Sequence, residues 1–402
     1  MNRTVDVLVV GAGPAGLAAA ARLAATGAGR VEVLEREEAA GGTPRHCART
    51  GFGVDALGRP LDGPGYARRA VRAALRAGAT VRTGVSATGW SGPLTLDLTA
   101  PTGLERVRAR AVVLATGARE RPRSARLVPG SRPAGVLTTG ELQRTVLRFG
   151  ARREHIGRRA VVVGGDPVAR AAVRTLRTAG VDVVAVVTED AGRRAAFGAV
   201  PVVGGAVVTE LLGRGRLSGV AIRDRDGRTG TLRCDTVVFT GDWIPDHELA
   251  RARGLPLAPG TRGPVTDGAF RTAEPGVFAV GNVLRGVEPA PVAAAEGRAV
   301  AAAVRERLDG GPWPPAGVPV VTAGPLRWVT PGLLGAEAAV PLLVRAERPL
   351  VRPVVTVAQD GAPLRRERLS GSLAPWRSVR LPPHWTSGVD LEGGPVVVSA
   401  EA

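Results

Sequence analysis

The first 35 residues combine two hydrophobic periodicities. Residues 5–10 form a mostly apolar run that predicts a buried strand, and the glycine-rich residues 11–16 follow it directly. Alanine and leucine dominate residues 17–26 and predict a helix, after which residues 31–34 form a second apolar run that ends at Glu35. The order strand, turn, helix, strand predicts a βαβ unit.

A similar pattern recurs about 150 residues further along the chain. Residues 160–163 are apolar, 164–169 contain the turn Gly-Gly-Asp-Pro, 173–179 have helical character, and 181–187 are rich in valine. The chain is therefore predicted to contain two nucleotide-binding units of the same type.

The apolar segments near 112–117 and 277–282 look like strands that return to the first sheet, so we expect the second unit to be inserted in the first. After residue 310, prolines around Trp313 predict a stiff linker, and short strand-like runs follow. The predicted fold is α/β, with two Rossmann-like domains and a small C-terminal β-rich domain. The expected bounds are 1–120 with 265–310 for the first domain, 121–264 for the inserted domain and 311–402 for the third.

Composition removes several mechanisms. All 54 basic residues are arginine, so Schiff-base chemistry and P-loop phosphate binding, which need a lysine, are excluded. Only Cys47 and Cys234 occur, which excludes a four-cysteine zinc site and an iron–sulfur cluster held wholly by this chain. No metal site is predicted.

The net charge of +18 raises the question of nucleic acid. The arginines are spread over every segment and only 3% of residues are aromatic, so stacking platforms for bases are not expected and nucleic-acid binding is not predicted. No apolar run approaches the roughly 18 residues that a membrane span requires. The apolar start of the chain runs into the glycine turn without a cleavage-site pattern, so we expect a cytoplasmic protein.

The first glycine turn has the spacing of a diphosphate-binding loop. Gly11 permits a tight turn from strand to helix, Gly13 lets the backbone approach a diphosphate, and Gly16 lets the helix pack closely on the strand. Glu35 lies 19 residues after Gly16, at the end of the next strand, where a carboxylate can bind ribose hydroxyls. Together these features predict a dinucleotide cofactor.

Residues 5–305 resemble the two-dinucleotide-binding-domain flavoproteins, the group of glutathione reductase and thioredoxin reductase. Gly41-Gly42, Ala115-Thr116-Gly117 and the stretch 276–282 agree with that family. The resemblance implies that the first site holds FAD, with Asn282 at a position where the family usually has an aspartate. The implied cofactor contacts are Gly11, Gly13, Pro14, Ala15, Gly16, Glu35, Gly42, Thr116, Gly117, Gly281 and Asn282.

Disulfide reduction needs two cysteines close enough to exchange electrons with the flavin. The glutathione reductase-like positions for them are Pro44 and Arg49 in this chain, and a Cys-x-x-Cys motif occurs nowhere. Cys47 and Cys234 are 187 residues apart in sequence. The chain is therefore predicted not to be a disulfide reductase.

A narrower resemblance rests on residues 115–122, 129–130 and 135–140 with Gln143. These segments are similar to the FAD subunits of bacterial amine and amino-acid dehydrogenases or oxidases, such as those of hydrogen cyanide synthase and opine oxidase. The resemblance implies oxidation of a carbon–nitrogen or similar bond of a small molecule by hydride transfer to flavin. It also implies a partner, either a second oxidoreductase or an electron-transfer subunit.

The second glycine turn leaves the question of NAD(P) open. Asp166 stands where a glycine would approach the diphosphate, and a carboxylate about 4 Å from a phosphate charge costs about 4 kcal/mol at an effective dielectric near 20. NAD(P)H would then bind poorly. If one glycine is instead deleted, Asp166 falls outside the turn, and Glu189 would favour NAD over NADP.

The loop 43–49 contains the candidate catalytic residues. By resemblance it lies against the isoalloxazine ring, where Arg45 or Arg49 could stabilise negative charge on the reduced flavin or bind a substrate carboxylate, and His46 could relay a proton. The alternative is that these side chains contact only the FAD phosphates or solvent. His247 lies in a turn, where a single histidine is usually solvated.

The leading hypothesis is an FAD-dependent oxidoreductase, similar to an amine or amino-acid dehydrogenase subunit, that passes electrons to a partner. One alternative is an NAD(P)H-dependent FAD reductase of a small acceptor. Another is a non-catalytic FAD-binding subunit whose β-rich C-terminal domain docks a catalytic partner.

Overall fold

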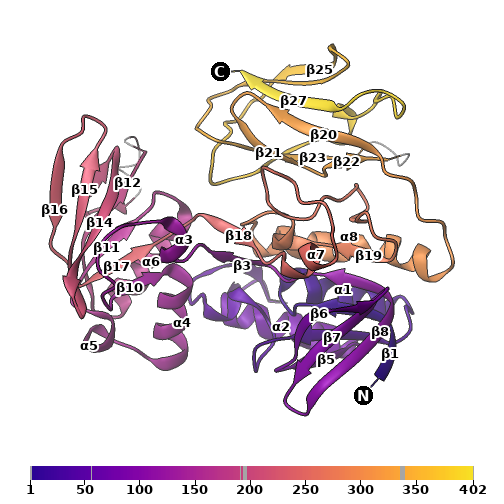
Figure 1. Cartoon of the computed structure of the whole chain (residues 1–402), viewed down its shortest axis with the longest axis horizontal. Helices are drawn as coiled ribbons and strands as arrows, with labels where there is room; N and C mark the ends of the chain where they lie inside the picture. Colours follow the sequence, from indigo (N-terminus) through magenta and orange to yellow (C-terminus); the bar gives the residue numbers. More distant parts are fainter. Residues whose placement is uncertain (1, 56, 191, 193–196, 336–339, 402) are drawn as a thin grey trace.

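The computed structural model describes residues 2–55, 57–190, 192, 197–335 and 340–401, and it has three lobes (Figure 1). The first domain lies at the lower right of the view, the inserted domain at the left, and the C-terminal strands above α7 and α8. The predicted α/β class, with two Rossmann-like domains and a β-rich C-terminal part, is confirmed.

The first domain is built on a sheet with the strand order β5-β2-β1-β8, in which all pairs are parallel and β19 also pairs with β8. The antiparallel strand β7 pairs with residues 103–108 of β8, and β6 pairs with β7, so these two strands extend the sheet. Its elements are β1 (Asn2–Val10), α1 (Pro14–Ala25), β2 (Val31–Glu35), β3 (Thr50–Val54), β4 (Pro60–Asp62), α2 (Gly63–Arg76), β5 (Thr80–Thr83), β6 (Ser86–Gly92), β7 (Thr95–Ala100), β8 (Gly103–Leu114), α7 (Glu248–Ala252), β19 (Val277–Ala279) and α8 (Ala290–Leu308), with the short 3-10 helices η1 (Thr43–His46) and η3 (Gly281–Val283).

Both faces of this sheet are covered, which explains why residues 7–10 of β1 and 111–114 of β8 are continuously apolar. Val7 and Val9 of β1 point into a core with α1 and α8, whereas Leu8 and Val10 point into a second core with β7, β19 and residues around Leu249. A parallel strand that is buried on both faces is typically a nearly continuous apolar run. The strand therefore carries no sequence alternation, as predicted for residues 5–10.

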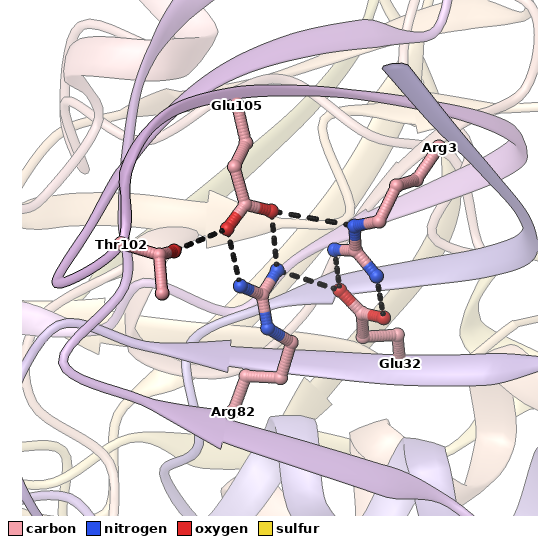
Figure 2. Close-up of polar contacts among 5 residues, drawn as sticks. All are labelled: Arg3, Glu32, Arg82, Thr102 and Glu105. Carbon is pink, nitrogen blue, oxygen red and sulfur yellow. Dashed lines mark hydrogen bonds and ion pairs between the residues drawn. The ribbon is translucent and has the colours of Figure 1, made fainter. Parts of the chain in front are cut away.

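Four charged side chains from four strands form a network across the first sheet (Figure 2). Arg3 donates to both oxygens of buried Glu32 at 2.9 and 2.7 Å, and Arg82 donates to both oxygens of Glu105 at 3.0 and 2.7 Å. Arg82 lowers the pKa of Glu105 to about 2. Thr102 also donates to Glu105. The alternation of two arginines with two glutamates leaves each charge paired, which is what burial of ions requires.

The inserted domain has a five-stranded parallel sheet with the order β10-β17-β11-β12-β13 and a three-stranded antiparallel sheet with the order β14-β15-β16. Its strands are β10 (Val136–Thr138), β11 (Arg159–Val163), β12 (Asp182–Thr188), β13 (Val202–Gly204), β14 (Ala206–Arg214), β15 (Arg216–Asp224), β16 (Thr229–Leu232) and β17 (Thr236–Phe239). Its helices are α3 (Arg123–Arg126), α4 (Thr139–Phe149), α5 (Arg153–Ile156) and α6 (Pro167–Thr178). The strand, turn and helix expected at 160–179 correspond to β11 and α6.

Two short antiparallel strands, β9 (Ala118–Glu120) and β18 (Trp243–Pro245), carry the chain into and out of the inserted domain. After β18, Leu249, Ala250 and Leu255 pack in the core of the first domain. The return to the first domain therefore lies near residue 245, about 20 residues earlier than the expected boundary at 264–265. The sequence hides this boundary because α7 is short and residues 253–268 have no clear periodicity.

The C-terminal domain consists of two packed sheets with the orders β22-β20-β27-β24-β25 and β21-β23-β26. Its elements are β20 (Val318–Ala323), β21 (Leu326–Thr330), β22 (Leu333–Leu334), β23 (Leu342–Ala346), β24 (Val354–Gln359), β25 (Ala362–Arg368), β26 (Val379–Leu381), β27 (Val396–Glu401) and the 3-10 helix η4 (Pro383–Trp385). The sheets enclose a core that includes Trp385. Among all described residues, no helix combines the length and apolarity that a membrane crossing needs.

Candidate functional site

A cavity of about 1130 Å³ lies where the three domains meet. It runs from the first glycine turn, past the crossover strands, to the second glycine turn, and β21, β23 and residues 375–376 form part of its wall. The residues of the predicted cofactor site that line it are Gly11, Gly13, Pro14, Ala15, Glu35, Gly42, Thr116, Gly117 and Asn282, and the two candidate catalytic residues Arg45 and His46 also line it.

Two glycines of the first turn, Gly11 and Gly16, are required by their geometry, whereas Gly13 faces open space. Gly11 has φ +107°, and a Cβ there would lie 2.3 Å from the carbonyl oxygen of Ala115. A Cβ at Gly16 would lie 1.9 Å from the carbonyl oxygen of Gly11, so Gly16 sits behind the cavity wall and permits close packing. At Gly13 a Cβ would meet no atom within 4 Å, because this position faces the cavity.

The start of α1 is open towards the cavity. Its N-cap is Gly13, which has no side chain to bond the first amides, and Pro14 stands in the first turn. The first N–H groups of a helix lack partners within the helix and carry positive partial charge. An uncapped helix start in a cavity of this size fits the diphosphate of FAD.

Glu35 lies at the end of β2 beside this helix start. Its carboxylate accepts hydrogen bonds from the amides of Ala12 at 3.2 Å and Glu37 at 3.0 Å. Burial raises the pKa of Glu35, and the two amides oppose that rise. The carboxylate is thus held in one orientation at the cavity wall, where it fits a ribose hydroxyl pair.

Gly42, Thr116 and Gly117 line the cavity near the first glycine turn. Gly42 has φ +62°, and a Cβ there would lie 2.8 Å from the Cα of Gly13. The hydroxyl of Thr116 donates to the carbonyl oxygen of Asp246 at 2.7 Å, and Gly117 has φ +81° with open space beyond it. These contacts bring the first domain and the crossover segment together around the cavity.

Gly281 and Asn282 follow β19. Gly281 has φ +76°, a Cβ there would lie 2.7 Å from the Cβ of Ala15, and its amide donates to Glu296 at 2.9 Å. Asn282 accepts from the amide of Glu288 at 2.8 Å. Gly281 is therefore a packing residue behind the wall, whereas Asn282 reaches the cavity.

Arg45 and His46 gather around Glu37. Arg45 donates to the Glu37 carboxylate at 3.0 Å and to the carbonyl oxygen of Ala39, and His46 Nε2 lies 3.7 Å from the same carboxylate. Burial raises the pKa of Glu37, but the positive charges of Arg144 and Arg45 outweigh burial, so the pKa is lowered overall. Burial and Arg45 lower the pKa of His46. Arg45 is thus engaged in an ion pair, and His46 favours the neutral form.

Cys47 and Gln143 meet across the two nucleotide-binding domains. The thiol of Cys47 lies 3.4 Å from Oε1 of Gln143, and both side chains line the cavity. Burial raises the pKa of Cys47, so the thiol stays protonated and can donate to the amide oxygen. The sequence singles out both residues but not their contact, because the contact depends on how α4 docks on η1.

The second glycine turn differs from the first at the helix start. Asp166 is the N-cap of α6, and its carboxylate accepts from the amide of Ala169 at 2.8 Å. Gly164 has φ +130°, and a Cβ there would lie 2.1 Å from Oγ1 of Thr240, so the tight turn itself is kept. The helix start that would receive a diphosphate is capped by a carboxylate.

Glu120 lies at the entry to the inserted domain. It is 8% exposed, and its Oε2 accepts from the amide of Gly140 at 2.7 Å in the first turn of α4. Burial raises the pKa of Glu120 to about 7. A carboxylate with this pKa changes charge near neutral pH at the junction of the two domains.

The part of the wall that comes from the C-terminal domain has no sequence motif. Trp328 and Arg345 lie on β21 and β23, and Trp376 lies on the segment before β26. Arg345 is 6% exposed. Arg345 bonds Gly286, Val287 and Glu288, which lie 57 to 59 residues earlier in the sequence, so no local pattern marks it.

Comparison with known proteins places this geometry in a family. The sequence model of the pyridine nucleotide-disulphide oxidoreductases matches residues 5–297, most of the chain. Among solved structures, thioredoxin reductase from T. acidophilum superposes on 77% of this chain and 99% of its own, with a TM-score of 0.63 and 24% identity. L-proline dehydrogenase from P. horikoshii superposes on 77% of this chain and 57% of its own, with a TM-score of 0.60 and 20% identity. These likenesses show the fold.

Curated relatives include components of oxidases. The alpha subunit of sarcosine oxidase from Corynebacterium sp. (strain P-1) is 33% identical over 279 residues, which are 62% of this chain and 27% of the relative. The A subunit of opine oxidase from Agrobacterium tumefaciens (strain Ach5) is 37% identical over 154 residues, 36% of this chain and 30% of the relative. The chain thus matches about a quarter to a third of the length of these relatives.

The predicted resemblance and the predicted FAD cofactor agree with these relatives and with the open start of α1. The chain belongs to the pyridine nucleotide-disulphide oxidoreductase family.

Proposed function

We propose that this protein is the FAD-binding subunit of an oxidase or dehydrogenase that acts on an amine or amino acid and passes electrons to a partner protein. The relatives described as sarcosine oxidase and opine oxidase subunits support the substrate class. Their description as subunits supports the partner. Both the proposed substrate class and the proposed partner require that electrons enter and leave the flavin without NAD(P)H.

The observation that carries this proposal is the contrast between two helix starts on one cavity. α1 begins at Gly13 with open amides, whereas α6 begins at Asp166, whose carboxylate already holds the amide of Ala169. A dinucleotide diphosphate at α6 would have to displace this cap and approach a negative charge. The first site therefore suits FAD, and the second disfavours NAD(P)H.

The cysteines support the exclusion of disulfide reduction. Cys47 lies at the cavity, and Cys234 is buried in the core of the inserted domain. Both are free thiols. A dithiol that exchanges electrons with the flavin needs two neighbouring sulfurs at the cofactor.

FAD supplies the electron-accepting ring, and the protein supplies binding and orientation. We assign the diphosphate to the start of α1 at Gly13, the ribose to Glu35, and the ribityl region to Asn282. Arg45 is committed to Glu37, so we propose that it holds the loop 43–49 in place, and that His46, neutral by its lowered pKa, is the group that accepts a proton.

The proposal is tested by reducing the purified protein without oxygen. The protein should be yellow, and its flavin absorbance should bleach with one member of a panel of amines, N-methyl amino acids and amino acids, but not with NADH. Bleaching by NADH at micromolar concentration would overturn the electron route. A colourless protein that gains neither colour nor thermal protection from added FAD would overturn the whole proposal.

A second candidate function is a non-catalytic FAD-binding protein that docks a catalytic partner. It is favoured by the small share of the oxidase subunits that this chain covers, because most of the length of those relatives lies outside the match. Amine-dependent bleaching of the isolated protein would exclude this candidate. The NAD(P)H-dependent reductase is supported only by the extension of the cavity to Glu189 and Arg225, and NADH-dependent bleaching with turnover of an acceptor would favour it.

A further inference from the structure

The segment 282–288, which runs from η3 to just before α8, connects the cofactor site to the C-terminal domain. Asn282 lies at the start of this segment and Glu288 at its end, and the two are joined twice. The amide oxygen of Asn282 accepts from the backbone N–H of Glu288 at 2.8 Å, and its amide nitrogen donates to the backbone oxygen of Glu288 at 3.4 Å. The orientation of Asn282 therefore depends on where Glu288 is held.

Glu288 is held by side chains of the C-terminal domain. Arg345 of β23 donates to its Oε1 at 2.6 Å, and Ser378, just before β26, donates to its Oε2 at 2.7 Å. Arg345 also donates to the backbone oxygens of Gly286 at 3.0 Å and Val287 at 3.1 Å. One arginine thus bonds three consecutive residues of the segment.

A second arginine fastens the other end of the same segment. Arg285 is 1% exposed and pairs with Glu296 of α8, which also accepts from the amide of Gly281 at 2.9 Å. The guanidinium groups of Arg285 and Arg345 lie 5.9 and 4.8 Å from the ring centre of Trp328. Trp328 belongs to β21, so the aromatic ring that contacts both arginines is part of the C-terminal domain.

Burying this charged cluster costs free energy. Stabilisation of the fold alone therefore does not explain why charged residues are used here. Arg285, Glu288 and Arg345 are at most 6% exposed, and burial of ions repays its desolvation only with complete hydrogen bonding. Apolar residues of similar volume could join the same surfaces at no greater cost. What the charged cluster adds is a fixed geometry for the backbone between Asn282 and Glu288.

We propose that Arg345 is a positioning residue for FAD, through which the C-terminal domain fixes Asn282 against the cofactor. From the sequence, this domain has a role only in one alternative, in which it docks a catalytic partner. The inference rests on the proposed binding of FAD at the first site. It makes the third domain part of the cofactor site, so that removal of its arginine loosens FAD without touching the diphosphate-binding turn.

The test compares Arg345→Gln with Arg380→Gln in the full-length protein. Arg380 is exposed on β26 of the same three-stranded sheet and does not line the cavity, so it is a matched control for loss of one arginine. The release of FAD after dilution is followed by the recovery of flavin fluorescence, and the absorption spectrum reports the surroundings of the ring. We expect release about tenfold faster in Arg345→Gln, with a shifted spectrum, and no change in Arg380→Gln.

Arg345→Gln leaves Glu288 with one fewer partner, so the variant could fail to fold. Arg345→Gln/Glu288→Gln removes both charges, and Ser378→Ala removes only one hydrogen bond to Glu288. In the double variant FAD release should also be faster, and in Ser378→Ala it should rise about threefold. Folded variants that release FAD at the wild-type rate with an unshifted spectrum would overturn the inference. Failure of the wild-type protein to bind FAD would overturn the proposed function instead.

Discussion

The starts of α1 and α6 have almost the same sequence setting and opposite chemistry. Each follows a buried parallel strand, each is preceded by a tight glycine turn, and each has a proline in its first turn. α1 has Gly13 at the N-cap and leaves its first amides to the cavity, whereas α6 has Asp166, whose side chain takes the amide of Ala169. The two helix starts thus differ in whether a side chain already occupies one of their first amides.

The start of α4 extends this contrast. Thr138 and Glu141 form a capping box, and Glu120 from β9 also accepts the amide of Gly140. Of these three helix starts, two are closed by carboxylates of the protein and one is open. Since carboxylates and phosphates compete for the same amides, the open start of α1 supports the proposed placement of the cofactor diphosphate there.

The largest effect is expected when the N-cap of α1 is given the aspartate that stands at the N-cap of α6. In Gly13→Asp, the new carboxylate should cap α1 and repel the diphosphate, weakening FAD binding about a thousandfold, because like charges about 4 Å apart cost about 4 kcal/mol at an effective dielectric near 20. FAD content after purification and a fluorescence titration measure the loss.

Gly13→Ala is the control for this variant. A Cβ at position 13 meets no protein atom within 4 Å, so the variant should fold, and any loss of FAD reports crowding of the cofactor without added charge. Retention of FAD in Gly13→Asp at wild-type affinity would contradict the placement of the diphosphate at α1.

The next largest effect is expected at Glu120. Its pKa in the folded protein is raised from 4.5 to about 7, mainly by burial, so the folded protein binds a proton that the unfolded chain has lost between these values. Stability should therefore fall as pH rises from about 4.5 to 7, by about 3 kcal/mol in total. Glu120→Gln should abolish this loss: it should be more stable than wild type at pH 8 and similar to it at pH 4.5. Urea unfolding of both proteins at both pH values checks this. If the free energies of unfolding of the variant and the wild type differ by the same amount at pH 4.5 and pH 8, the prediction is wrong.

The smallest effect is expected at the N-cap of α6, where the charge of Asp166 is removed. Asp166→Asn keeps a capping side chain but removes the charge, so NADH should bind about tenfold more tightly with little change in stability. Asp166→Ala removes the cap and should cost about 1 kcal/mol of stability. NADH fluorescence titration and thermal unfolding separate the two effects. Tight NADH binding by the wild-type protein would show that Asp166 is no obstacle.

Local patterns are sufficient for much of the fold. The runs around β1 and β11 are apolar because both faces of a parallel sheet are buried, and Gly16 is required by its contact with Gly11 in the same turn. The boundary of the inserted domain, by contrast, lies about 20 residues before its predicted place. It depends on Leu249 and Leu255 packing against strands more than 130 residues earlier, and no local periodicity reports such a contact.

The candidate site divides in the same way. The residues of the first turn, Glu35 and Asp166 can be chosen from the sequence because their chemistry is set by neighbours within a βαβ unit. Arg45 stands out by its charge, but the sequence does not reveal its partners, Glu37 and the carbonyl oxygen of Ala39. A charged side chain has several partners within reach, and packing selects one.

The sequence by itself determined the two nucleotide-binding units, the contrast between their two glycine turns and the absence of lysine and of a Cys-x-x-Cys motif, since each rests on residue identity and short spacing. Only the tertiary structure decided that Arg345 and Trp328 reach the segment after Asn282, that Cys47 meets Gln143, and that Glu120 is buried at the domain junction. Those contacts join residues far apart in the chain, and their free energies depend on burial and geometry that exist only after the three domains have packed together.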